Sequence, residues 1–327
     1  MCIRDSGTVI DALSPEYPEQ FTDISYGRDD SGDLRFFQEL TPGGTNSATS
    51  FAGLTNDTKF SVDRGYFTES FFLEITSSTP GATIIFTTDG SEPSSTNGLR
   101  HLFPILIDDT STIRAIALSN DLIPTNVDTQ SYFFVEDILT QSPSNRLPDE
   151  WGGEPADYEM DSMVVNDPTY SDQFEESFAA LPTLSLVFDS DAFFDESDGI
   201  YQNPLREGAA WERPLSAELI VPNGTEEGFQ IDAGVRIQGG SSRDPDTPKH
   251  SLSLRFRRQY GAGKLDYPLF QNEPHGEDAA ESFDYLQLRP EYNFGWMHRH
   301  WYQLSLIHIS EPTRQEAISY AVFCLKK

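Results

Sequence analysis

Glycine, serine and basic residues gather in one stretch of an otherwise acidic chain. From position 234 to 270 the sequence reads GVRIQGGSSRDPDTPKHSLSLRFRRQYGAGKLDYPLF. Backbone N–H groups and hydroxyls in a glycine-serine turn can cradle a phosphate, and neighbouring basic side chains can meet its charge. The sequence therefore predicts a phosphate site whose candidate residues are Gly239, Gly240, Ser241, Ser242, Arg243, Lys249 and Arg255.

The elements that must position these residues are two short strands. Residues 251–257 alternate, with Leu252, Leu254 and Phe256 on one face and serines and arginines on the other, which predicts a half-buried strand with an open basic face. Residues 235–237 predict the preceding strand. Two interpretations stay open: a nucleotide-binding lid, or a β-hairpin whose basic face is simply solvated, because glycine loops without a full phosphate motif are common.

The same stretch resembles the N-terminal part of the spore-coat CotH kinase family. The motifs are the glycine-serine turn, the basic strand, and a Tyr-Gly segment followed by KLDYPLF; segments at 182–186, 199–204, 211–214 and 283–289 extend the resemblance over about 150–303. His250 and Ser253 depart from the pattern, since the family usually has basic residues there.

The resemblance implies a protein kinase that uses ATP with Mg²⁺ to phosphorylate serine or threonine of a partner protein. In such a scheme the turn and the basic strand hold the phosphates, and carboxylates on a second lobe bind the metal and act as base. We expect that second lobe to follow Gln303. No catalytic residue and no metal ligand is assigned in this sequence.

Both ends of the chain read as translated sequencing adapters. They are MCIRDS at 1–6, LSLIHISEPTR at 304–314 and ISYAVFCLKK at 318–327, and we expect residues 304–327 to share no core with residues 183–270. The natural part would then be open at both ends. Both cysteines, Cys2 and Cys324, fall in these segments, so the remainder predicts no disulfide, thiolate nucleophile or cysteine metal site.

The net charge is -31, from 53 acidic and 22 basic residues. Such a surface repels nucleic acids and anionic membranes, so nucleic-acid binding is excluded. No apolar run approaches the about 18 residues of a membrane span, and we expect no span in the chain. No signal peptide is visible. We expect an extracellular or cell-envelope location from the resemblances to module families that are described next.

Length and turn residues predict several domains. Short β-rich runs at 71–75, 82–87, 113–118 and 130–134, separated by turn residues, predict a β-sandwich with Asp89-Gly90 at a hairpin tip. This module is similar to the chitobiase and β-hexosaminidase C-terminal β-sandwich, an accessory domain that carries no catalytic residues. Residues 7–46 resemble the C-terminal end of a lamin-tail domain.

The fold class is therefore mainly β: a β-sandwich followed by a β-rich α+β kinase-like N-lobe, incomplete at its C-terminus. A continuous strand at 183–188 is expected at the centre of the sheet, and Pro222-Asn223-Gly224 predicts a hairpin. The expected domains are adapter 1–6, lamin-tail end 7–46, linker 47–58, β-sandwich 59–135, wrapping linker 136–180, kinase-like part 181–303 and adapter 304–327.

Other chemistry is less favoured by the spacing. The glycine-serine turn lacks the glycine after serine that a hydrolase nucleophile needs. His298 and His300 would chelate a metal or lie on the surface beside Trp301, and the surface interpretation is favoured because nearby carboxylates are absent. The acidic loop at 189–198 would hold a cation or be solvated, and it lacks the spacing of a known calcium loop.

Two hypotheses from different classes remain. The first is a secreted or envelope multidomain bacterial protein with a CotH-like kinase region that acts on a protein phosphoacceptor. The second is a non-catalytic surface adhesion protein, whose sandwich and degenerate kinase-like domain present surfaces to glycans or other cells. The full-length gene would discriminate the two, because aspartates that follow Gln303 in it would support kinase chemistry and their absence would support the binding protein.

Overall fold

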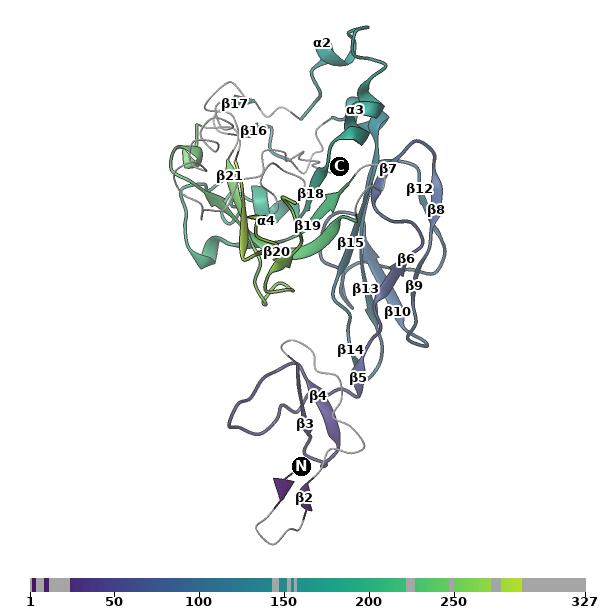
Figure 1. The fold of residues 1–327 in the computed structure, drawn as a ribbon, viewed down its shortest axis with the longest axis vertical. Helices are drawn as coiled ribbons and strands as arrows, with labels where there is room; N and C mark the ends of the chain where they lie inside the picture. Colours follow the sequence, from purple (N-terminus) through teal and green to yellow (C-terminus); the bar gives the residue numbers. More distant parts are fainter. Residues whose placement is uncertain are drawn as a thin grey trace. The chain divides into compact units, whose positions relative to one another are not determined.

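The computed structural model describes residues 2–3, 9–11, 24–142, 147–151, 154–155, 158–221, 227–246, 250–271 and 278–289. The chain divides into two compact units, Met1–Thr55 with Leu118–Pro124, and Asn56–Ala117 with Thr125–Lys327. The fold is mainly β, as predicted (Figure 1). In the part that is described, no helix is long and apolar enough to cross a membrane. Lys249, His298, His300 and the 304–327 segment lie outside the described residues.

The first unit consists of short strand pairs. Antiparallel pairs join β1 to β2 and β3 to β4, and a parallel pair joins β14 to β5. Phe37 is fully buried, and Arg35 forms an ion pair with Asp121. The strands are β1 (Cys2–Ile3), β2 (Val9–Asp11), β3 (Ser25–Arg28), β4 (Leu34–Phe37), β5 (Gly53–Leu54) and β14 (Leu122–Ile123).

The second unit begins with a sandwich built from the predicted β-rich runs. One sheet has the order β11-β10-β13-β15-β7, and the pairs β12-β8 and β6-β9 complete the module. Its core contains Leu73, Ile75, Ile113 and Tyr132. The strands are β6 (Thr58–Phe60), β7 (Gly65–Phe67), β8 (Phe71–Leu73), β9 (Ile75–Ser77), β10 (Thr83–Thr87), β11 (Leu99–Arg100), β12 (Ile105–Ile107), β13 (Ser111–Leu118) and β15 (Asp128–Phe134).

The tight hairpin predicted at Asp89-Gly90 is wrong, because the whole segment 88–98 connects β10 to β11. Asp89 Oδ1 accepts hydrogen bonds from the N–H and the hydroxyl of Ser91, which makes a local turn at the start of this loop. Gly90 has a φ of +81°, and its carbonyl accepts a hydrogen bond from the Arg114 guanidinium at 3.0 Å. The pair thus opens a longer loop anchored to β13.

The connection after the sandwich, predicted as a wrapping linker, contains short helices. Phe178 packs with Tyr66 against a small apolar cluster of Phe133, Ile138 and Ile220. Tyr158 is buried, and its hydroxyl donates to the Pro148 carbonyl. The elements are α1 (Val135–Leu139), β16 (Glu150–Trp151), β17 (Glu154–Pro155), α2 (Ser162–Val165) and α3 (Phe174–Ala180).

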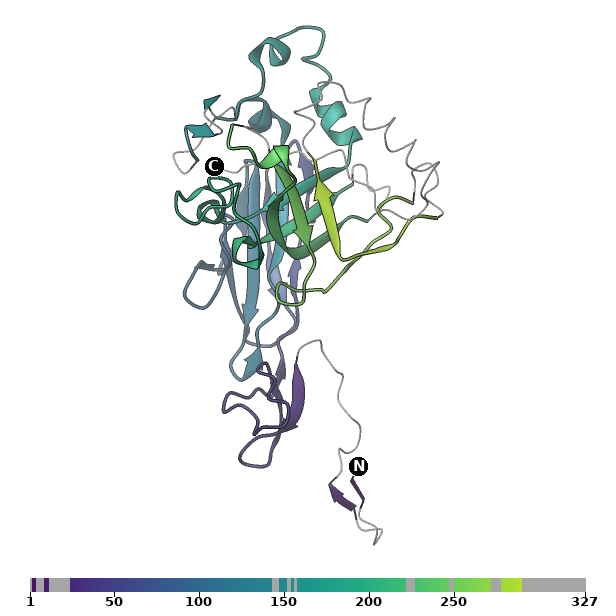
Figure 2. The ribbon, with the colours of Figure 1, turned by 90° about the vertical axis from the view of Figure 1, so that its left-hand side faces the viewer.

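The C-terminal part is a five-stranded antiparallel sheet of order β18-β19-β20-β21-β24, coloured from teal to yellow in Figure 2. The strands on either side of the predicted Pro222-Asn223-Gly224 turn pair antiparallel, Leu219 with Phe229, whereas these three residues lie outside the described part of the chain. The elements are β18 (Thr183–Val187), α4 (Ser190–Phe194), η1 (Ala209–Trp211), β19 (Arg213–Ile220), β20 (Phe229–Gln238), η3 (Ser241–Arg243), β21 (Ser251–Arg255), β22 (Leu265–Asp266), β23 (Ser282–Phe283) and β24 (Tyr285–Leu288).

The prediction that β18 lies at the centre of the sheet is wrong: β18 is an edge strand. All five of its residues are nevertheless buried. Leu184 and Leu186 enter the core of the sheet, whereas Thr183 and Ser185 contact the sandwich through Tyr66 and Ser131. The continuous apolar-rich run therefore indicates that both faces of the strand are buried. An edge strand can be buried on both faces, as a central strand is.

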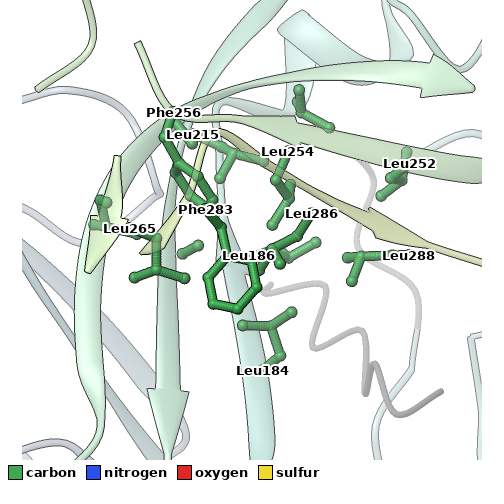
Figure 3. Packing of buried hydrophobic residues seen from close by; sticks show 14 of the residues in the cluster. Leu184, Leu186, Leu215, Leu252, Leu254, Phe256, Leu265, Phe283, Leu286 and Leu288 are labelled. Atoms are coloured by element: carbon green, nitrogen blue, oxygen red, sulfur yellow. The ribbon is translucent and has the colours of Figure 1, made fainter. Parts of the chain in front are cut away.

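The apolar face of the basic strand was predicted correctly. Leu252, Leu254 and Phe256 lie in one hydrophobic core with residues of the other strands (Figure 3). The opposite face is not open as predicted, because Ser251 and Ser253 are both buried. Arg255 and Arg257 on this face are only half-buried, so the face is closed at the start of β21 and partly open toward its end.

Leu254 is fully buried, so we expect Leu254→Ala to lower the free energy of unfolding by about 2 to 5 kcal/mol through lost contacts and a residual cavity. Urea unfolding of the full chain measures the change. Leu205→Ala is the matched control, because Leu205 is exposed and its loss should change the free energy by about 0.5 kcal/mol or less. Equal losses for the two variants would contradict the assignment of this core.

Candidate anion-binding site

The glycine-serine turn closes on itself. Gly239 has a φ of +111°, and a Cβ there would lie 2.3 Å from the Ser242 hydroxyl, so glycine is required at this position. The buried Ser242 donates its hydroxyl to the Gln238 carbonyl at 2.6 Å, and the Arg243 N–H donates to the Gly240 carbonyl at 3.0 Å. Two of the predicted phosphate-binding groups thus stabilise the turn itself.

Arg243 ties the turn to a neighbouring segment. Its Nη1 donates to the carbonyls of Pro204 at 3.2 Å and Arg206 at 3.0 Å, and its Nη2 donates to the Ile237 carbonyl at 2.8 Å. Nη1 also lies 3.3 Å from a Glu207 carboxylate oxygen. Backbone carbonyls therefore take up the Nη donors that were predicted to meet a phosphate, whereas Arg243 Nε is buried with no hydrogen-bond partner among the described residues.

His250 holds the other side of the turn. Its buried ring donates from Nδ1 to the Ser242 carbonyl at 2.6 Å, and its backbone N–H donates to the Tyr201 hydroxyl at 3.3 Å. Burial lowers the pKa of His250, although the bond to Ser242 opposes this shift. A neutral, hydrogen-bonded histidine suits this buried position better than the basic residue expected from the family pattern.

Arg255 lies at the far end of β21 from this turn. Ser251 pairs with Gln238 beside the turn, whereas Arg255 pairs with Gly234 four residues along the strand. At the usual rise of a strand this separation is about 13 Å. Four of the predicted residues therefore lie together at the turn with the backbone of Ser241: Gly239, Gly240, Ser242 and Arg243. Arg255 lies elsewhere on the sheet. Lys249 is outside the described residues.

Arg255 instead belongs to an arginine cluster, which we define as Arg236, Arg255 and Arg257 around Glu212. The Glu212 side chain is only 1% exposed. Its Oε2 lies 2.5 Å from Arg236 Nε and its Oε1 lies 3.5 Å from Arg257 Nε. The Arg236 N–H is not aligned with the carboxylate, so this contact is an ion pair without a well-formed hydrogen bond.

A glycine makes room for this cluster. A Cβ at Gly234 would lie 2.4 Å from the Tyr260 ring and 2.6 Å from Glu212 Oε1, so both side chains lie directly over the backbone of β20. Gly234 pairs with Arg255 on β21, and the Arg255 guanidinium lies 5.9 Å from the centre of the Tyr285 ring. Aromatic side chains thus flank the cluster.

The arginine cluster carries more positive than negative charge. The pKa of Arg255 is lowered, first by burial and then by Arg236 and Arg257, while Glu212 and Tyr285 oppose the shift. Arg255 Nε is buried and has no hydrogen-bond partner among the described residues. An anion would relieve the repulsion between the guanidinium groups and accept their hydrogen bonds, as carboxylates and phosphates do.

Sequence reasoning found Arg255 but missed Arg236 and Glu212 as site residues. The signal was present in the register: in an antiparallel pair, Arg236 opposite Ser253 lies on the same face as Arg255, two residues along the neighbouring strand. Glu212 immediately precedes β19, which pairs with β20. Adding the hairpin register to the alternation would have brought the three residues together.

The acidic loop is organised by its own backbone. Asp189 accepts from the Asp191 N–H at the start of α4, and Asp195 accepts from the N–H groups of Ser197 and Asp198. The hydrogen bond from the Ser197 hydroxyl, followed by those from the backbone N–H groups of Asp198 and Ser197, lowers the pKa of Asp195. Across the described residues, no group of three or more histidine, cysteine or acidic side chains is placed to hold a metal ion.

We expect Glu212→Gln to lower the free energy of unfolding by up to about 3 kcal/mol, because it removes the counter-charge from Arg236 and Arg257. Chemical unfolding checks the loss. The matched control is Glu281→Gln, since Glu281 is exposed and its removal should be near neutral. If high concentrations of phosphate restored no stability to Glu212→Gln beyond their effect on the control, the cluster would not be acting as an anion site.

Comparison with known proteins identifies only the sandwich. A family model described as Fn3 associated matches residues 73–132, a segment that runs from the end of β8 into β15. This segment is therefore a β-sandwich-associated module. No curated protein and no solved structure matches the chain.

Proposed function

We propose that the five-stranded sheet is a nucleotide-binding lobe that contacts phosphates through the arginine cluster, within a secreted or envelope multidomain bacterial protein. The observation that carries this proposal is a half-buried excess of guanidinium groups in a chain of net charge -31. Burial and the mutual repulsion of these guanidinium groups are unfavourable, and an anionic partner would relieve both.

The class of anion follows from the geometry and from the resemblance to CotH kinases. Guanidinium groups bind phosphate oxygens in pairs, and the aromatic rings of Tyr260 and Tyr285 flank the cluster. ATP supplies phosphates of this kind, and in the family-like scheme ATP with Mg²⁺ serves phosphorylation of a protein acceptor. Arg236, Arg255 and Arg257 would hold the phosphates; the described residues offer no carboxylate group that we assign to Mg²⁺.

A second function is favoured by apolar side chains exposed on the sandwich. Phe72 and Leu106 form a cross-strand pair that faces solvent, and Leu102 and Phe103 precede β12 with most of their surface exposed. Exposed apolar surfaces of this kind often mark interaction sites. The alternative is therefore a non-catalytic surface scaffold, in which a chitobiase-type sandwich binds a glycan or another protein.

The two functions differ in what the arginine cluster does. We expect titration calorimetry of the full chain to detect ATP in the presence of Mg²⁺, and to detect pyrophosphate in its absence. Arg255→Ala should weaken both about ten- to a hundredfold, because a charge-assisted contact to phosphate contributes about 1.5 to 3 kcal/mol. Arg100→Ala, which removes an exposed arginine from β11 of the sandwich, should leave both affinities unchanged.

Particular outcomes separate the alternatives. Equal affinities for wild type and Arg255→Ala would remove the phosphate assignment from this cluster. Weakening by Arg243→Ala alone, in a variant that stays folded, would return the site to the glycine-serine turn. An absence of ATP and pyrophosphate binding altogether would favour the non-catalytic scaffold.

A further inference from the structure

A layer of polar side chains is buried between the sandwich and the five-stranded sheet. The Ser131 hydroxyl on β15 lies 3.1 Å from the Ser185 hydroxyl on β18, and the Tyr66 hydroxyl on β7 lies 2.7 Å from the Thr183 hydroxyl. Ser131, Ser185 and Thr183 are all buried. Both sheets thus turn a polar face inward, and these hydroxyl groups pair across the contact.

Glu218 on β19 lies in the middle of this layer and is fully buried. Its Oε2 accepts the Ser131 hydroxyl at 2.5 Å, and its Oε1 accepts the Ser131 N–H at 3.2 Å. A single residue of the sandwich therefore provides both hydrogen bonds to one carboxyl of the sheet. Because an unpaired buried carboxylate is strongly unfavourable, this contact couples the two modules.

Charged and titratable groups face Glu218 from both sides. Arg64, which precedes β7, places Nη1 3.6 Å from Glu218 Oε1 and also donates to the Phe229 carbonyl at 2.8 Å. Arg114 on β13 interacts with both Glu218 and Asp232, and Tyr132 on β15 is close enough for Glu218 to raise its pKa. The arginines favour an ionised Glu218, and burial opposes it.

The serine partners allow Glu218 to exist in both protonation states. When Glu218 is ionised, the Ser131 hydroxyl donates to it. When Glu218 carries a proton, its hydroxyl can donate to Ser131 Oγ, and the Ser131 hydrogen can turn to Ser185 at 3.1 Å or to Thr112 at 3.3 Å. The layer therefore stays hydrogen-bonded after a proton is gained, which a carboxylate held only by arginines would not allow.

We propose that Glu218 is a proton-operated latch between the sandwich and the five-stranded sheet: the two are held tightly when Glu218 is protonated, and the loss of this proton loosens them. The latch is distinct from the arginine cluster, although both lie on the sheet face opposite the hydrophobic core. The latch responds to a proton on Glu218, whose hydrogen-bond partner Ser131 is present only when the sandwich and the sheet are in contact.

The direction of the pH dependence follows from linkage. Burial raises the pKa of Glu218 to about 7, against the opposing effects of Arg64 and Ser131, whereas an exposed glutamate titrates near its ordinary value. The folded state thus holds the proton to a higher pH than the unfolded state. The stabilisation is fully present below the ordinary pKa of glutamate and is lost as pH rises through about 7.

The experiment is denaturant unfolding of the full chain between pH 5 and 8, for wild type and Glu218→Gln at constant ionic strength. Asp128 and Asp232 also have pKa values raised by burial, to about 6, so the comparison between variants isolates Glu218. Between pH 5 and 7 the ratio of wild-type to Glu218→Gln unfolding constants should rise with pH, by up to about tenfold per pH unit for one proton. Glu281→Gln, an exposed control, should follow wild type.

A titration of the wild-type chain labelled with ¹³C at glutamate carboxyls keeps the proposal testable if Glu218→Gln fails to fold. One carboxyl should titrate near pH 7. Ser131→Ala should move this midpoint upward, because the Ser131 hydroxyl favours the ionised form. Parallel pH profiles for wild type and a folded Glu218→Gln, or titration of every glutamate near its ordinary pKa, would overturn the latch.

Discussion

The burial of Glu218 against Ser131 is the constraint on which the arrangement of the second unit depends. Two β-sheets usually pack through apolar faces, but here the apolar cluster of Phe133, Ile138 and Ile220 lies beside a layer of serine, threonine, arginine and carboxyl groups between the sandwich and the five-stranded sheet. Such a layer is stable only if nearly every polar atom finds a partner. The position of β15 over β18 and β19 must therefore be maintained closely.

This constraint divides the polar face of the five-stranded sheet between two roles. Strand β20 runs through both: Gln230 and Asp232 lie in or beside the layer that faces the sandwich, and Arg236 lies in the arginine cluster. Among the described residues, the buried carboxylate of Glu212 is the one that forms ion pairs with the cluster. A movement of β20 that relaxed the layer would also move Arg236, so the two features are mechanically connected through one strand.

Local pattern predicted most of the strands and the apolar side of the core. Alternation assigned Leu252, Leu254 and Phe256 to one face, and turn residues marked the β19–β20 hairpin. What failed concerns the opposite face. Nothing near Ser253 or Thr183 in the sequence reveals what covers these residues; Thr183, for example, meets Tyr66, which lies 117 positions away along the chain. Burial on a second face depends on which modules pack together.

The predicted site also combines one feature that local sequence predicted with one that depends on distant contacts. Gly239 was assigned to a turn because its backbone N–H group could reach a phosphate, whereas the structure requires glycine there for its positive φ. The role of Arg243 could not be inferred, since its partners are backbone carbonyls at 204, 206 and 237. Residue type indicates that a cation is present, and only the fold shows whether its donors are already occupied.

Native-state hydrogen exchange measures most directly whether the sandwich and the five-stranded sheet form one body. Slowly exchanging amides of β13 and β15 should share the same opening free energy and the same denaturant dependence as those of β19 and β20, because separating the sheets would leave Glu218 and Arg114 without their partners. The Ser131 amide, which donates to Glu218, should belong to this common set. Two groups of amides with different opening free energies, divided between the sandwich and the sheet, would contradict this account.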